Sequence, residues 1–261
     1  MTSARVFFFG GIASYRALFG WLSPWVFIPS LLVAPVFQIL LFVYIGRSAQ
    51  LESDEFYVIG NAIQYAAIPC LFAMTHLIAG ERFQQTLGYI LITPARRLPL
   101  FLGRALPVVV NGFFVAAFSL VVGGAIVGMQ VPASAWGPIA LATAVSAFSC
   151  TGLGLVNAGL GFVVRETSVL SNIIFGLLLV FTGANVPVDQ LPRWMQIVSE
   201  GMPFTHGIEA VRRLADGGAL ADVWGLIGLE ALIGVVYGAG GYALIRAMEV
   251  VGRRHATLER A

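Results

Sequence analysis

Six long apolar stretches follow one another along the chain, separated by short segments in which charged and turn-forming residues gather. Each stretch approaches the roughly 20 residues that a helix needs to cross a bilayer. The stretches are unbroken rather than alternating, which favours helices over the strands of an outer-membrane barrel. We therefore expect an all-α membrane protein with six transmembrane helices, at about 23–46, 56–79, 105–129, 139–164, 168–184 and 223–245.

The fifth stretch, 168–184, is short for a full crossing, and half of a re-entrant hairpin is an alternative for it. A long segment, 185–222, separates it from the last span. There the pattern predicts two short helices, around 191–199 and 203–214, that end before the glycines at 217–218. We expect this extracellular segment to be helical or re-entrant, with part of it in the outer leaflet.

The first 22 residues combine an apolar stripe with basic residues away from it. The stripe consists of Phe8, Ile12, Tyr15, Phe19 and Leu22. This spacing predicts an interfacial helix that lies on the membrane over 1–22, and a plain cytoplasmic extension of the first span is the alternative. No short apolar core with a small-residue cleavage site stands here, so we expect the first span itself to direct insertion.

Small residues crowd the fourth span. They are Ser146, Ser149, Gly152, Gly154, Ala158, Gly159 and Gly161. Membrane helices associate largely through close packing at such residues, so we expect another helix to approach this span closely. Cys70 and Cys150 also fall within apolar stretches, where a small buried hydrophobe is a commoner role than a disulfide.

Composition agrees with a chain that is embedded almost entirely in a membrane. Of its 261 residues 58% are apolar and 11% charged, and the mean hydropathy is +0.87. Soluble domains carry about a quarter charged residues. Six spans leave little chain for a soluble catalytic domain, so we expect one transmembrane domain over 1–261.

The basic residues indicate which side faces the cytoplasm. All fifteen are arginine, and the net charge of +2 is too small and dispersed to suggest nucleic-acid binding. Eleven fall in the first segment, the loop at 80–104, the segment after span four and the tail at 246–261. The positive-inside rule then predicts both termini in the cytoplasm and segment 185–222 outside.

A few polar residues inside the spans are candidates for a translocation path. They are Asn61, Gln64, Asn157, Asn172 and Glu230. The four amides either line the path or form hydrogen bonds between helices. Glu230 lies about six residues into the last span, near the outer interface by the 1.5 Å helical rise, where a structural role competes with a path-lining role.

Convergent ionisable or metal-binding groups at one depth are not evident, which disfavours an intramembrane enzyme. Inverted repeats and charged residues at the midplane, typical of ion-driven secondary transporters, are not evident either. We expect no metal site and no resident cofactor in this chain.

Two motif blocks stand out, one in the loop before the third span and one in the segment before the last span. The first contains Gly80-Glu81-Arg82, Gln85-Thr86-Leu87, Leu91-Ile92-Thr93-Pro94 and Arg96-Arg97. The second contains Gly183, Val186-Pro187, Leu191-Pro192, Trp194, Met202-Pro203-Phe204-Thr205 and Ile208-Glu209-Ala210-Val211-Arg212. Together the blocks resemble the type-2 ATP-binding-cassette (ABC) transporter permease family. In that family a glycine usually precedes the threonine of the first block, where this chain has Gln85.

The resemblance implies an exporter of the bacterial plasma membrane in which two permease subunits, identical or homologous, pair above two copies of a cytoplasmic ABC ATPase. It implies an interfacial amino-terminal helix and a cytoplasmic coupling helix within 80–104. The residues that this assigns to ATPase coupling are Glu81, Arg82, Thr93, Pro94, Arg96 and Arg97.

The chain has no lysine and therefore no phosphate-binding loop of the Gly-rich Lys-Ser or Lys-Thr type. ATP and Mg are accordingly expected to bind to the partner ATPase. As substrate we expect amphipathic small molecules such as a drug or antibiotic. A lipid or lipid-linked glycan is the alternative, and an ion-driven secondary transporter is a second one.

Overall fold

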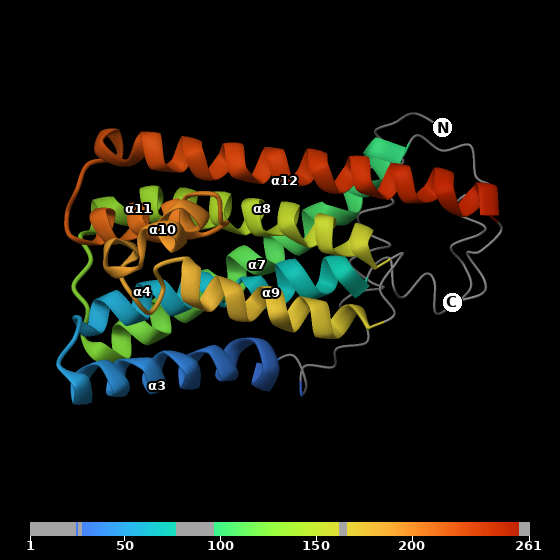
Figure 1. Cartoon of the computed structure of the whole chain (residues 1–261). Coiled ribbons are helices and arrows are strands. Elements are labelled where there is room, and N and C mark those ends of the chain that lie inside the picture. The colour runs from blue at the N-terminus through green and yellow to red at the C-terminus, as the bar shows by residue number, and fades with distance from the viewer. Residues whose placement is uncertain (1–24, 26–27, 77–96, 162–165, 256–261) are drawn as a thin grey trace.

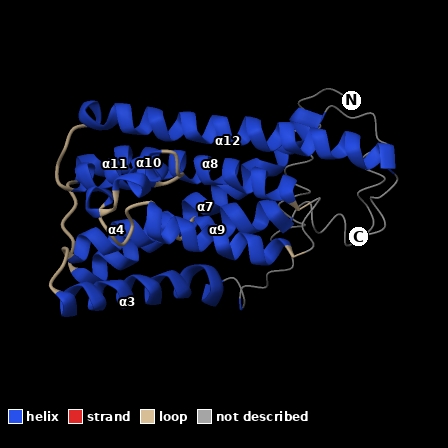
Figure 2. Ribbon diagram, viewed as in Figure 1, coloured by secondary structure: helices blue, strands red, loops and turns tan. Residues whose placement is uncertain are grey.

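The computed structural model describes residues 25, 28–76, 97–161 and 166–255, and this part of the chain contains helices and no strand (Figure 2). Its principal helices are α3 (Ala34–Ala49), α4 (Asp54–Gln64), α7 (Arg97–Val127), α8 (Trp136–Leu160), α9 (Thr167–Phe181), α10 (Arg193–Glu200), α11 (Thr205–Ala215) and α12 (Leu220–His255). The long helices run roughly side by side, with α3 and α12 on opposite sides (Figure 1).

Five helical segments of the described chain are long and apolar enough to cross a membrane. They are Leu31–Ala49, Asp54–His76, Leu102–Val127, Ala133–Leu160 and Leu220–Met248. These segments coincide with the first four and the last of the expected spans, so the all-α membrane class is confirmed. Within the described residues the first of these segments starts at Leu31, and a π-helical stretch, Ile28–Val33, leads into it. Most of the expected start, 23–27, lies outside the described residues.

The fifth expected span corresponds to α9, which has only 15 residues. At 1.5 Å per residue it is about 22 Å long, less than the roughly 30 Å hydrocarbon core. Its shortness agrees with the sequence, and whether it crosses the membrane stays a prediction.

Helix α4 and its continuation to His76 form the centre of the bundle. In the most apolar stretch of this span 78% is buried, whereas the corresponding shares are 28% for Leu31–Ala49 and 22% for Leu220–Met248. The regular hydrogen bonding of α4 ends at Gln64, and a π-helical turn, Ile68–Phe72, follows. Pro69 lies in this turn and has no N–H to donate, which accounts for the shift in hydrogen bonding.

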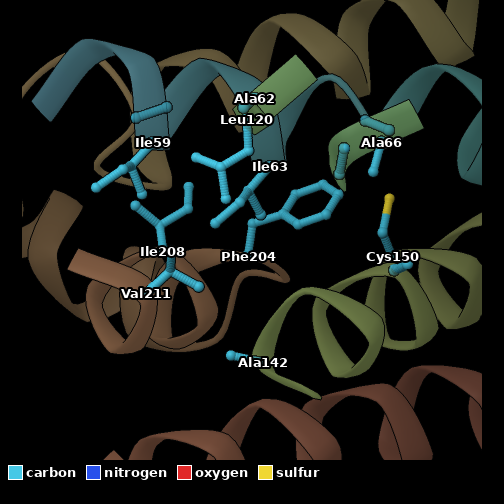
Figure 3. Packing of buried hydrophobic residues seen from close by; sticks show 14 of the residues in the cluster. Ile59, Ala62, Ile63, Ala66, Leu120, Ala142, Cys150, Phe204, Ile208 and Val211 are labelled. Carbon is cyan, nitrogen blue, oxygen red and sulfur yellow. The ribbon is translucent and has the colours of Figure 1, made fainter. Parts of the chain in front are cut away.

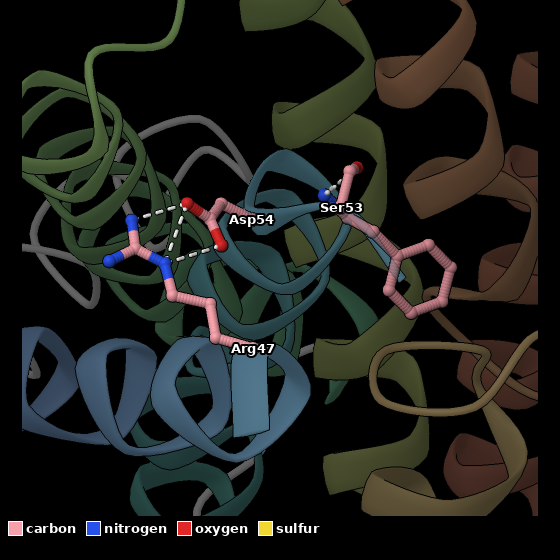
Figure 4. A network of polar contacts seen from close by, with 4 residues as sticks. Arg47, Ser53 and Asp54 are labelled. Carbon is pink, nitrogen blue, oxygen red and sulfur yellow. Dashed lines mark hydrogen bonds and ion pairs between the residues drawn. The ribbon is translucent and has the colours of Figure 1, made fainter. Parts of the chain in front are cut away.

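The turn between α3 and α4 is closed by polar contacts (Figure 4). The hydroxyl of Ser53 accepts a hydrogen bond from the Phe56 N–H at 3.3 Å and so caps α4. Arg47, in the last turn of α3, forms an ion pair with Asp54, and its Nε lies 2.9 Å from Oδ1. The contact fixes two neighbouring spans at one end of the bundle.

Helices α8 and α12 approach so closely that several glycines along their contact leave no room for a side chain. A Cβ at Gly152 would lie 2.6 Å from the Gly234 carbonyl oxygen, and one at Gly241 would lie 2.6 Å from the Val156 nitrogen. On another side of α8, a Cβ at Gly154 would lie 2.5 Å from the Cys70 carbonyl oxygen. The expected close approach at small residues is confirmed.

Two short helices, α10 and α11, occupy the segment between α9 and α12, and each begins two residues later than expected. They lie at the end of the bundle where α4 begins (Figure 1). Cys70 and Cys150 are free and buried, as expected. The expected interfacial helix at 1–22 and most of the coupling loop at 80–104 lie outside the described residues.

Candidate functional site

The first turn of α11 is built around Phe204, a fully buried residue with a left-handed backbone, φ 77°. Its ring belongs to the same core cluster as Ile63 and Leu120, from α4 and α7 (Figure 3). Positive φ is unfavourable for a bulky side chain, so the surroundings must hold it.

A carboxylate from another helix holds this turn. Glu230 of α12 is fully buried, and its Oε1 accepts the Phe204 N–H at 2.7 Å while its Oε2 accepts the Gly207 N–H at 3.2 Å. The hydroxyl of Ser149, on α8, also donates to Glu230 Oε1. The first N–H groups of a helix have no partner within the helix, and an anion is favoured there, so Glu230 caps α11 from outside it.

The same point joins α11 to α8 through a second close approach. A Cβ at Gly207 would collide with the hydroxyl oxygen of Ser146 and would lie 3.6 Å from Glu230 Cγ. Both Ser146 and Ser149 are buried. Helices α8, α11 and α12 therefore meet at one junction, which we call the Glu230 junction: Ser146, Ser149, Phe204, Gly207 and Glu230.

The last turn of α11 is held by a partly buried cation, Arg212. Its Nη2 donates to the carbonyls of Gly183 at 2.8 Å, Phe56 at 3.1 Å and Ala184 at 3.4 Å. The guanidinium carbon lies 3.6 Å from the centroid of the Phe56 ring, a cation–π contact. Burial lowers the pKa of Arg212 to about 10, so the side chain is charged at neutral pH.

Asn61 and Gln64 belong to a cluster of amides between α3, α4 and the chain after α9. Gln38 Nε2 donates to Asn61 Oδ1 at 3.1 Å and to Gln64 Oε1 at 3.2 Å, and Asn61 Nδ2 donates to Asn185 Oδ1 at 2.9 Å. Gln64 Nε2 is buried without a hydrogen-bond partner. The cluster thus retains one unused donor.

Asn157 lies in a different cluster, which joins α8 to α9 and to the end of the second span. Its Nδ2 donates to Thr75 Oγ1 at 2.7 Å and to Ser171 Oγ at 2.8 Å, while its buried Oδ1 has no partner. Asn172 is exposed and donates only to the Ser168 carbonyl of its own helix, at 2.9 Å.

The five path candidates are therefore not gathered in one place. Asn61 and Gln64 share a cluster, whereas Asn157, Asn172 and Glu230 stand apart from it and from one another. Of the coupling candidates, Glu81, Arg82, Thr93, Pro94 and Arg96 lie outside the described residues, and Arg97 begins α7. Within the described part of the chain, no group of three His, Cys, Asp or Glu residues could hold a metal ion.

Sequence reasoning missed the roles of Arg212 and Ser149 in joining helices. The signal for Arg212 was present, because it lies four residues after the buried Ile208 on the same face of α11. Ser149 gave no comparable signal, since a serine in a small-residue helix is usually explained by packing.

A helical bundle with five apolar candidate spans and buried polar clusters defines a multi-pass membrane protein. The chain belongs to the ABC-2 type transporter family, whose model matches residues 8–214. It is similar to the probable multidrug ABC transporter permease YbhR of Escherichia coli (strain K12), with 25% identity over 173 residues. The protein of the same name from Escherichia coli O157:H7 shows the same identity. The match covers 65% of this chain and 46% of either relative, so the chain spans about half the length of the curated relatives it matches.

Proposed function

We propose that this chain is the membrane subunit of an ATP-driven exporter, which moves amphipathic small molecules out across the bacterial plasma membrane. The observation that carries the proposal is the match of an ABC-2 type transporter model to residues 8–214 of a helical, apolar bundle. The name of the relative, a probable multidrug permease, supports the substrate class.

Two cytoplasmic ABC ATPase subunits bind and hydrolyse ATP with Mg beneath a pair of permeases, which are identical or homologous. The lack of any lysine in the 261 residues supports hydrolysis by a partner, because the usual phosphate-binding loop requires one. Closure of the ATPases pushes on Glu81, Arg82, Thr93, Pro94, Arg96 and Arg97. The push shifts the population between inward-open and outward-open states.

The polar clusters suit a substrate that combines apolar surface with a few polar groups. Gln64 retains a buried unused donor and Asn157 a buried unused acceptor, each within a small polar cluster of the bundle. Buried polar groups without partners are costly, so a substrate or water that reaches them in another state of the cycle gains a hydrogen bond.

Copurification tests the proposal. The tagged chain is extracted from its native membrane in mild detergent, bound proteins are identified and ATP hydrolysis is measured. We expect a stoichiometric ATPase that is lost when Arg96 and Arg97 are both changed to Glu. The matched control changes Arg253 and Arg254 to Glu, a second arginine pair in the predicted cytoplasmic tail, and retains the ATPase.

Substrate efflux from vesicles completes the test. Efflux of an amphipathic dye that requires ATP supports the drug-type substrate, whereas ATP-dependent movement of a labelled lipid alone favours the lipid alternative. A chain that purifies alone and transports along an ion gradient without ATP contradicts the exporter.

A further inference from the structure

Three hydrogen-bond donors converge on the carboxyl group of Glu230. Two come from the backbone of α11 and one from the side chain of α8, and no part of Glu230 is exposed. Charged side chains in membrane helices are rare and costly, so this one must serve the protein. Donors from two other helices converge on its two oxygens, which points to a role in positioning.

The chemistry of the junction favours a carboxylate. The two backbone N–H groups can only donate, and an ionised carboxyl group offers an acceptor to each of them without a proton or N–H of its own. A glutamine at this position would direct its NH₂ group, a donor, toward the N–H of Phe204 or Gly207, which is also a donor. The two α11 bonds stabilise a strained turn, because Phe204, whose N–H forms one of them, has a φ of 77°.

Arg212 supplies the complementary contact at the other end of the same helix. Its cation lies in the last turn of α11 and binds carbonyls that follow α9, together with the Phe56 carbonyl at the start of α4. An anion at the start and a cation at the end both match the dipole of α11. Both ends of α11 are therefore fixed to spanning helices or to the chain that joins them.

We propose that Glu230 is a positioning residue of the transport cycle, whose carboxylate fixes the start of α11 to α8 and α12 so that the three helices move as one body. Helix motion during transport is then confined to contacts elsewhere in the bundle. The role of Glu230 in a transport cycle rests on the proposed function. Its attachment of α11 to α8 and α12 does not.

Hydrogen exchange tests the fixing directly, on the full chain in lipid nanodiscs. In Glu230→Gln we expect the Phe204 and Gly207 amides to exchange about tenfold faster, because loss of bonds to a charged group makes local opening easier. Glu209→Gln is the matched control: it makes the same chemical change on α11, but at an exposed ion pair with Arg213, and leaves both amides unchanged.

A second variant keeps the proposal testable if Glu230→Gln does not accumulate. Ser149→Ala removes one donor and leaves the carboxylate, so a smaller acceleration of the same two amides is expected. The proposal is overturned if both amides exchange as slowly in Glu230→Gln as in the unmodified chain. Where Glu230→Gln does not accumulate, the same result in Ser149→Ala overturns it.

The amount of substrate transported per ATP hydrolysed distinguishes a positioning residue of the transport cycle from a residue that only stabilises the fold. With the ATPase bound, Glu230→Gln should retain ATP hydrolysis but transport severalfold less substrate per ATP, whereas Glu209→Gln should leave the ratio unchanged. A Glu230→Gln complex with the normal ratio shows that the junction stabilises the fold without serving the cycle. If the unmodified complex transports nothing with ATP, the exporter function fails, and the exchange result still decides whether Glu230 fixes α11.

Discussion

At the scale of single residues, the two arginines of α11 show how position decides the contribution of a charge. Arg212 lies within the bundle against three carbonyls and the Phe56 ring. Arg213 is the next residue, and it forms an exposed ion pair with Glu209 four residues earlier. The first contact is shielded from water and the second is screened by it.

We predict that Arg212→Ala lowers stability by about 2–4 kcal/mol, because it leaves carbonyls without a donor and opens a gap beneath Phe56. Arg213→Ala, the matched control, should cost less than about 0.5 kcal/mol. Thermal unfolding of both variants in the same detergent measures the difference. Equal losses would contradict the structural role given to Arg212.

A second residue-scale prediction concerns Gly207. Gly207→Ala places a methyl group against the Ser146 hydroxyl, so α11 must shift from the Glu230 junction, at a cost of about 1–3 kcal/mol. Gly225→Ala is the control, because a Cβ there meets no atom within 4 Å and alanine favours a helix. The same unfolding assay applies, and a stable Gly207→Ala variant would argue against close contact of α8 and α11.

At the scale of the elements, neighbouring helices are joined by a small number of side-chain amides. Asn157 links α8 to Thr75 and to Ser171 of α9, whereas Asn172 of α9 bonds only within its own helix. Helix α9 has few buried residues, Thr167, Ser171 and Leu178, so the contact with Asn157 is a large part of what fixes its first turns.

We predict that Asn157→Leu loosens α9, at a cost of about 1–2 kcal/mol, near the upper range for hydrogen bonds between membrane helices. Asn172→Leu should be tolerated. Protease digestion in nanodiscs, with cleavage scored by mass spectrometry within α9, reports the loosening. Similar digestion of the two variants would show that Asn157 does not hold α9.

The elements were largely predictable from the sequence, and their long-range contacts were not. Apolar runs of about 20 residues predicted five of the spans, and the proline and glycine positions predicted α10 and α11. The partners of Glu230 lie 23 to 81 residues away along the chain, and no local pattern encodes such a pairing. Depth alone placed Glu230 near the interface, whereas its full burial follows from the way α11 folds back over it.

At the scale of the whole molecule, orientation in the membrane is the prediction with the widest consequences. The arginine distribution predicts segment 185–222 outside and the tail inside. Trp194, on α10, is 63% exposed and so offers a site for labelling from the outside. The two native cysteines are buried and should give little background.

We predict that Trp194→Cys reacts with a membrane-impermeant maleimide in intact cells. A cysteine in place of Arg253 should react only after the membrane is opened. Labelling yields before and after permeabilisation measure both. The reverse pattern would place the termini outside and would reject a cytoplasmic ATPase beneath 80–104.

The length of α9 also affects the lipid around the protein. If this helix of about 22 Å crosses the membrane, the bilayer beside it must thin by several ångströms, while the longer helices on other sides favour ordinary thickness. The protein would then have an uneven hydrophobic perimeter, with a local depression along one side. Short-chain lipids would gather there, and the mechanical cost of each transport cycle would depend on the thickness of the host membrane.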